Sequence, residues 1–349
     1  MSDVLKRILS LTLSAVVITG CISVCSFVCN HPSEEIENTV SSFYREPDNS
    51  LDVVIIGSSA ANKDLQPAVI WQQCGVTSYN FSIGACSANI YKSILKEAVS
   101  KQSNAIFVVD IDGFVVDDQF QKEKDPIRLW ADSIPRNDNH KEVVNKFFAD
   151  NKAERYYPFI RYHRNMTSLT AYIPITIRLL KKDILQTKDA LGGATVNDKK
   201  SADVKQFSSE NFGVSEMTTY SMQIFNDFIS FCIDKSLKNV IFVSFPKSYN
   251  DDSTLKRNIE YSERTNYIRN AVEKYGYIVL DYNSLGNPAQ LNYKTDFADT
   301  LHLTTEGAVK FSKYFGQYIS ENYIFSKKSD ETVADWNSRT KEANAILGL

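Results

Sequence analysis

The chain has 349 residues, of which 43% are hydrophobic and 23% charged, and its formal net charge is −3. This composition is typical of a folded globular protein and excludes an intrinsically disordered chain. The nearly balanced charge also excludes the strongly basic surface that nucleic-acid-binding proteins carry.

The first predicted element is an uncharged segment, Ile8–Cys29. As a helix rising about 1.5 Å per residue it extends about 33 Å, which is enough to cross a bilayer core. Lys6 and Arg7 precede this segment, and three glutamates follow it. Positive charge on the short side predicts a cytoplasmic tail at residues 1–7, a transmembrane anchor at 8–29 and an extracytoplasmic remainder.

Two other interpretations of this segment remain open. Ile18–Cys21 resembles a relaxed lipoprotein cleavage box, and a cleaved signal peptide also begins with an apolar segment. We favour the uncleaved anchor, because apolar residues continue past Cys21 and no small-x-small cleavage site follows cleanly.

The cysteines form two groups. Cys21, Cys25 and Cys29 lie four residues apart and so share one face of the predicted membrane helix, which indicates a packing face of small residues. The other three are Cys74, Cys86 and Cys232. Their spacing does not predict a metal site, and no disulfide pairing follows from it.

Beyond a polar segment at 30–50, expected to be a juxtamembrane stalk, buried strands alternate with amphipathic helices. Short apolar runs predict strands, and residues with helical spacing predict helices between them. This βαβ rhythm predicts a parallel sheet with helices on both faces. The strands are expected within residues 51–57, 76–85, 104–112, 238–246 and 277–282, and the helices within 59–71, 89–101, 218–236, 266–276 and 304–323.

Two segments lie outside this rhythm. Residues 114–215 are predicted to be an insertion with helical pieces that forms a cap over the sheet edge. Residues 326–349 are a charged tail, expected to form a peripheral helix. The main domain is therefore expected to span residues 51–325.

Polar residues follow several of the predicted strands. Ser59 comes directly after the first strand, while Asp299 and His302 lie between the last strand and the last helix of the domain. The carboxyl ends of parallel strands meet at one edge of a sheet, where ligands usually bind. A serine hydroxyl becomes a nucleophile when an imidazole, itself oriented by a carboxylate, accepts its proton. The sequence therefore predicts a Ser59–His302–Asp299 catalytic triad.

The sequence resembles the SGNH (GDSL-like) hydrolases. IIGSSA is similar to their first block with Ser59 as nucleophile, NFSIGA to the second, and DTLHLTTEGAVKFS to the fifth, the D-x-x-H motif. The resemblance implies a three-layer α/β/α flavodoxin-like fold. It also implies an oxyanion hole formed by backbone N–H groups of Ser59 and of Gly84 or Ala85.

This sequence departs from the family in its third block. The block normally supplies an asparagine after the third strand, but here Asp110 and Asp112 stand in VVDIDGF. An ionised carboxylate cannot donate a hydrogen bond to an oxyanion. We expect these two aspartates to cap the loop.

The anchor, the GSS turn and the inserted YYPFIRYH resemble the DltD-like branch of envelope acyl-transfer proteins. This likeness implies a serine acyl esterase or acyltransferase that modifies envelope glycan or teichoic acid with D-alanyl or acetyl groups. It further implies a polytopic membrane O-acyltransferase as partner, no metal or organic cofactor, and Tyr162 and His163 as acceptor-site residues.

Each assignment has a structural alternative. Ser59 is also suited to cap a helix, His302 to lie in the core, and Tyr162 and His163 to form the core of the cap. Two functional alternatives also remain open: an esterase that removes acetyl groups, and a non-catalytic glycan-binding partner of an acyltransferase.

Overall fold

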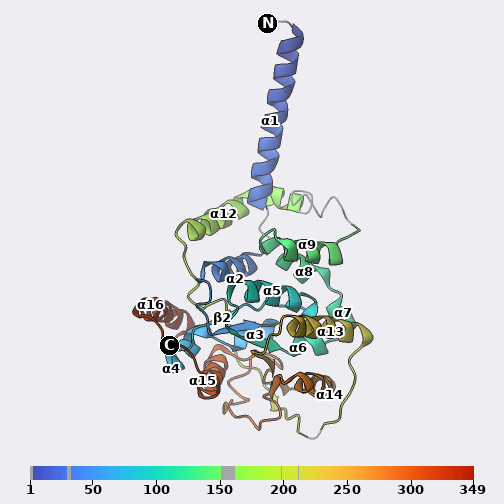
Figure 1. Ribbon diagram of the computed structural model, residues 1–349, viewed down its shortest axis with the longest axis vertical. Helices are drawn as coiled ribbons and strands as arrows, with labels where there is room; N and C mark the ends of the chain where they lie inside the picture. Colours follow the sequence, from blue (N-terminus) through green and yellow to red (C-terminus); the bar gives the residue numbers. More distant parts are fainter. Residues whose placement is uncertain (1–2, 30–32, 151–161, 198, 211) are drawn as a thin grey trace.

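The computed structural model describes residues 3–29, 33–150, 162–197, 199–210 and 212–349. It is a mixed α/β structure around a five-stranded parallel sheet with strand order β2-β1-β3-β5-β7 (Figure 1). The strands are β1 Val53–Ile56, β2 Ser78–Asn80, β3 Ile106–Asp110, β5 Val240–Ser244 and β7 Ile278–Asp281. A short antiparallel pair, β4 Lys205–Gln206 and β6 Ser248–Tyr249, lies apart from this sheet.

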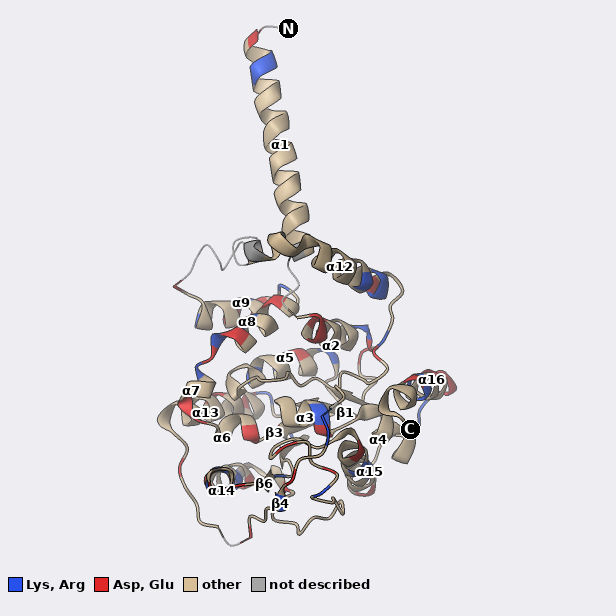
Figure 2. Cartoon of the chain, turned by 180° about the vertical axis from the view of Figure 1, so that it is seen from behind, with Lys and Arg blue, Asp and Glu red and all other residues tan. Residues whose placement is uncertain are grey.

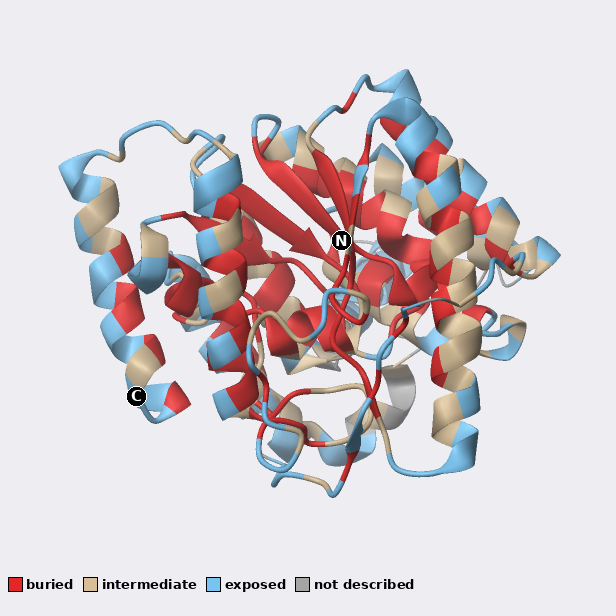
Figure 3. Cartoon of the chain, turned by 90° about the horizontal axis from the view of Figure 1, so that it is seen from below, coloured by how far each residue is buried: buried red, intermediate tan, exposed pale blue. Residues whose placement is uncertain are grey.

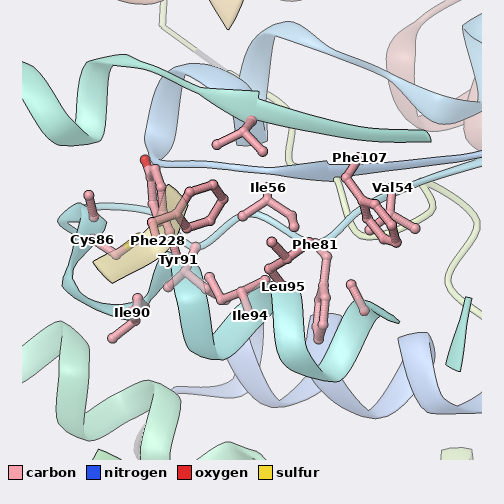
Figure 4. Close-up of a cluster of buried hydrophobic side chains, with 14 of the residues drawn as sticks. Val54, Ile56, Phe81, Cys86, Ile90, Tyr91, Ile94, Leu95, Phe107 and Phe228 are labelled. Carbon is pink, nitrogen blue, oxygen red and sulfur yellow. The ribbon is translucent and has the colours of Figure 1, made fainter. Parts of the chain in front are cut away.

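Both faces of the sheet are covered, as the apolar strands predict. Alternate side chains of each strand enter opposite cores: Val54 and Ile56 join one, whereas Val53 and Ile55 join the other. Figure 4 shows the first core, where Phe107 and Phe228 are among the side chains drawn. Figure 3 shows the buried strands between layers of helices whose outer surfaces are exposed.

Helices on the two faces come from distant parts of the chain. The core that contains Val54 receives side chains from α2 Glu34–Arg45, α5 Tyr91–Lys101, α8 Lys124–Ser133, α13 Thr219–Asp234 and the end of α14 Asp252–Val272. The core that contains Val53 receives them from α3 Ser59–Asp64, α4 Pro67–Cys74 and α15 Thr305–Asn322. Other helices in the described residues are α6 Asp112–Val115, α7 Asp118–Gln121, α9 Asp138–Phe147, α12 Leu169–Ile184, α16 Asp330–Leu347 and the 3-10 turns η1 Ala88–Ile90, η2 His163–Ser168 and η3 Glu273–Tyr275.

The N-terminal helix α1, Asp3–Cys29, extends away from the domain (Figure 1). Its apolar span, Asp3–Val28, is long enough to cross a membrane, a property that a signal sequence near an N-terminus shares. Its charged residues lie at the start of the helix (Figure 2).

The expected stalk at 30–50 is wrong for most of its length. Residues Glu34–Arg45 form α2, whose first turn is capped by the Ser33 side chain. Val40 and Phe43 of this helix are buried in the core. Polar residues on one side of an amphipathic helix gave this segment the composition of a linker.

The insertion and the tail also differ from expectation. Helices α8, α9 and α12 stack on the side of the domain nearest α1, not over the sheet edge (Figure 1). Among the described residues of the insertion, Thr195 and Asn197 contact α3 and the loop before α15, at the carboxyl edge. The tail forms the expected helix, α16, but Trp336 is buried against Trp71 with ring centroids 5.6 Å apart, so this helix belongs to the packed domain.

Candidate active site

The turn after β1 presents two serines at the carboxyl edge of the sheet. Ser58 caps α3, and Ser59 is the first residue of that helix. Gly57 precedes them at a point where a side chain has no room. A Cβ at this position would lie 2.5 Å from the Ala61 Cβ and 2.6 Å from the Asp110 Cβ. Glycine therefore lets β1 turn sharply into α3 against the end of β3.

The three residues predicted as a triad lie in hydrogen-bond contact. The Ser59 Oγ is 2.8 Å from the His302 Nε2, and the His302 Nδ1 is 2.9 Å from each carboxylate oxygen of Asp299. The predicted geometry is therefore confirmed. A proton on Nδ1 would be donated to Asp299, leaving Nε2 free to accept the Ser59 proton.

Asp299 is held in its ionised form. Partial burial raises its pKa, but hydrogen bonds and charge attraction from His302, with the N–H groups of Leu301 and His302, outweigh burial and lower the pKa to about 2. The two N–H groups donate to the Asp299 Oδ1 at 2.9 and 3.0 Å. The carboxylate is therefore an acceptor over the whole neutral range, as a residue that orients an imidazolium must be.

A buried carboxyl links the histidine loop to the nucleophile helix. Asp64 lies at the end of α3, and its Oδ1 accepts the N–H of Leu303 at 3.0 Å. Burial raises the pKa of Asp64 well above its usual range. This bond connects helix α3, which begins at Ser59, to the loop that carries His302. No sequence pattern predicts this contact, because a polar residue near the end of a helix is ordinary.

Asp110 is fully buried and supports the serine turn. Its Oδ2 accepts the Ser58 N–H at 3.1 Å and the Ser58 hydroxyl at 2.7 Å, while its Oδ1 accepts the Asp112 N–H at 2.8 Å. Burial, and then the charge of Asp112, raise the pKa of Asp110 to about 7. This agrees with the predicted capping role.

Asp112 is paired with a buried lysine that the sequence analysis overlooked. The Lys247 ammonium follows β5 and donates to the Asp112 Oδ1 at 2.7 Å, to the Ser244 Oγ at 3.1 Å and to the Phe245 carbonyl at 3.3 Å. Its three donors are thereby matched by three acceptors, as a buried charge requires. The pair joins the ends of β3 and β5.

Gly84 and Ala85, the expected oxyanion-hole residues, lie in a turn beside the end of β1. The Ile83 N–H donates to the Gly57 carbonyl at 3.0 Å, which brings the turn alongside the serines. Ala85 has a φ of 55°, a left-handed conformation that costs energy for a residue with a side chain. Within the described part of the chain, no protein acceptor takes the N–H of Ser59, Gly84 or Ala85.

The later part of the insertion borders the triad. The Thr195 N–H donates to the Asn62 carbonyl at 3.1 Å, and the Asn197 side chain donates to the Leu303 carbonyl at 2.8 Å. The exposed Lys199 ammonium lies 3.7 Å from the Asp299 Oδ2. Thr195, Asn197 and Lys199 therefore lie beside the triad.

The two expected acceptor-site residues are placed elsewhere. The Tyr162 hydroxyl hydrogen-bonds Asp132 in α8, and η2, which begins at His163, packs against α1. The side chain of His163 lies outside the described part of the chain. Nothing in these contacts brings Tyr162 to Ser59. The cysteines expected outside the membrane segment, Cys74, Cys86 and Cys232, are free thiols.

The arrangement combines a hydroxyl, a base in contact with it, an orienting carboxylate and N–H groups that no protein acceptor takes among the described residues. Such a set is suited to nucleophilic acyl chemistry. Comparison with models of known protein families finds no match, and comparison with curated proteins finds none either.

Proposed function

We propose that this protein is a membrane-anchored serine acyltransferase or esterase of the SGNH type that modifies a cell-envelope glycan or teichoic acid with acyl groups such as D-alanyl or acetyl. The single observation that carries the proposal is the Ser59–His302–Asp299 hydrogen-bonded chain. Ser59 and His302 are 243 positions apart in the sequence, yet they meet at the carboxyl edge of the sheet. The sheet order and the placement of the serine after β1 are consistent with the resemblance to SGNH hydrolases.

In the proposed reaction the Ser59 Oγ attacks the carbonyl carbon of an acyl ester or thioester while His302 Nε2 takes the hydroxyl proton. His302 then gives that proton to the departing alkoxide or thiolate, which leaves an acyl ester on Ser59. A glycan hydroxyl next loses its proton to His302 and attacks this ester. His302 then gives that proton to the departing Ser59 Oγ, which releases the acylated polymer and restores the free serine. Asp299 stabilises the imidazolium in both steps.

Transfer is favoured over hydrolysis by the surroundings of Asp110. Its carboxyl accepts hydrogen bonds from Ser58 and Asp112, so it does not replace the oxyanion donor that the third block normally supplies. Loss of one such donor typically costs about 10²–10³ in rate. A bound acceptor recovers rate through proximity, whereas bulk water does not.

The deciding experiment measures the ester content of purified envelope glycan from wild-type and Ser59→Ala cells. We expect the variant to lose the acyl decoration. Equal ester content would refute the catalytic role and leave a non-catalytic binding role, whereas increased ester content would indicate a deacetylating esterase.

The proposed location is tested separately. The cationic start of α1 favours a cytoplasmic N-terminus and an extracytoplasmic domain. An alkaline phosphatase fusion at the C-terminus should be active, and the full chain should stay with membranes after a carbonate wash. A soluble product that begins near residues 22–35 would contradict the anchor and the proposed polytopic O-acyltransferase partnership that depends on it.

A further inference from the structure

Helix α12 carries an apolar stripe on its outer side. Ile173, Ile177, Leu180 and Ile184 are spaced by four, three and four residues, so they share one face of the helix. All four are exposed, with Ile177 60% and Ile184 79% accessible. A surface helix of a soluble domain normally turns such a stripe toward the core.

The side of α12 that faces the domain buries Leu179 and is held by polar contacts. Arg178 pairs with Glu34 at 2.7 Å, the Lys182 ammonium donates to the Asn38 side chain at 2.7 Å, and Asp183 pairs with Arg45. These contacts all go to α2. Because these contacts hold α12 to the protein, they fix its orientation, and the apolar stripe faces outward.

The position of α12 identifies what covers this stripe. The helix crosses the base of α1 (Figure 1), where the Thr176 hydroxyl lies 3.4 Å from the Val28 carbonyl at the end of the apolar span. A bilayer around α1 would therefore end at the level of α12. A helix with its apolar face toward acyl chains and its polar face toward water is the form that interfacial membrane helices take.

We propose that α12 lies in the surface of the lipid bilayer, with the stripe Ile173, Ile177, Leu180 and Ile184 inserted among the lipids. This rests on α1 being a membrane anchor, as proposed above. One spanning helix alone would let the domain rotate and tilt, whereas α1 and α12 together fix its orientation. The apolar helix α1 and the apolar stripe of α12 lie next to each other, at the base of α1 (Figure 1).

The same contacts connect α12 with the candidate active site. Arg178 of α12 pairs with Glu34, and the neighbouring Glu35 lies close to Gly84 in the oxyanion turn, 3.9 Å from the position that a Cβ there would occupy. A chain of neighbours thus runs from α12 through the first turn of α2 to the catalytic edge. The substrate class that fits this placement is an acyl donor or acceptor held at the membrane surface.

The test uses the full chain in vesicles of phosphatidylcholine and phosphatidylglycerol, with and without brominated acyl chains, which quench nearby indoles. Ile177→Trp reports on α12 and Val16→Trp on the middle of α1. Ile324→Trp, at a fully exposed apolar residue between α15 and α16, is the matched control. The native tryptophans are buried in the protein and add a constant background.

We expect brominated lipid to remove about half or more of the fluorescence added at Ile177, because an interfacial side chain lies about 5–10 Å into the headgroup and acyl boundary. The Ile324→Trp signal should be unchanged. Quenching at Val16 without quenching at Ile177 would overturn the placement of α12 and leave the anchor intact. Absence of quenching at both would overturn the anchor and this proposal together, and Ile184→Trp repeats the test at a second stripe position.

Discussion

Two loops at the carboxyl edge of the sheet each carry a pair of polar residues, and the two pairs have opposite surroundings. Asp299 and His302, in the loop after β7, are partly exposed, and His302 Nε2 faces Ser59. Asp110 and Asp112, in the turn after β3, are buried and bound to Ser58 and Lys247. A position after a parallel strand therefore does not by itself suit a residue to catalysis, because the residue must also be accessible and keep hydrogen-bond capacity.

The largest effect should come from substitutions in the partly exposed set of Ser59 and His302. Ser59→Ala and His302→Ala should each lower ester turnover about 10⁴-fold or more, because the nucleophile and the base act as one unit. The measurement is hydrolysis of a small ester by the purified protein. Unfolding midpoints close to wild type serve as the control, and retained turnover in either variant would rule out this triad.

Asp299→Asn should have the next largest effect and lower ester turnover by about 10²–10⁴-fold. The amide oxygen can still accept hydrogen bonds from the N–H groups of Leu301 and His302, so the loop should keep its shape. The neutral amide, however, cannot stabilise the imidazolium. Turnover and the urea unfolding curve, measured on the same preparation, separate chemistry from folding. A loss below about threefold would mean that Asp299 does not orient His302.

Substitutions in the buried pair Asp110 and Asp112 should lower the stability of the protein more than its turnover. Asp110→Ala leaves the half-buried Ser58 N–H and the buried Asp112 N–H without their acceptor, and we expect the free energy of unfolding to fall by about 2 kcal/mol or more. Asp110→Asn keeps an acceptor oxygen, so its free energy of unfolding should fall less. The pair of variants is compared by urea denaturation; equal losses would show that the carboxylate charge, not hydrogen bonding, matters at this position.

Asp110 should also give stability a distinctive pH dependence. Its pKa is about 7 in the folded protein and about 3.9 when unfolded. Between these values the folded state keeps a proton that the unfolded state has released, so stability falls as pH rises from about 4 to about 7. Asp110→Asn should make the difference in unfolding free energy between pH 5 and pH 8 smaller than in wild type; an unchanged difference would contradict the assignment.

The smallest effect is expected at Lys199. Its ammonium is 67% exposed and lies 3.7 Å from Asp299, and exposed ion pairs contribute little. Lys199→Ala should change turnover less than about threefold, and added salt should reduce even that difference. A larger loss that salt leaves unchanged would indicate that Lys199 contacts the substrate.

Much of this protein follows from local sequence patterns. The apolar runs determined the strands, because a strand buried on both faces needs consecutive apolar residues. The serine after β1 and the D-x-x-H spacing identified Ser59, Asp299 and His302, because chemistry restricts which side chains can serve. The uncharged N-terminal segment identified the helix that is able to span a membrane.

Other features were decided by tertiary structure alone. Helix α2 looked like a stalk until Val40 and Phe43 entered the core, and Tyr162 looked like a site residue until it bonded Asp132. The same holds for Asp64 and Lys247, whose partners lie far away along the chain. Local sequence encodes the period of an element and the chemistry of a side chain. Burial and partnership depend on packing between distant segments, and that packing placed the apolar stripe of α12 outward.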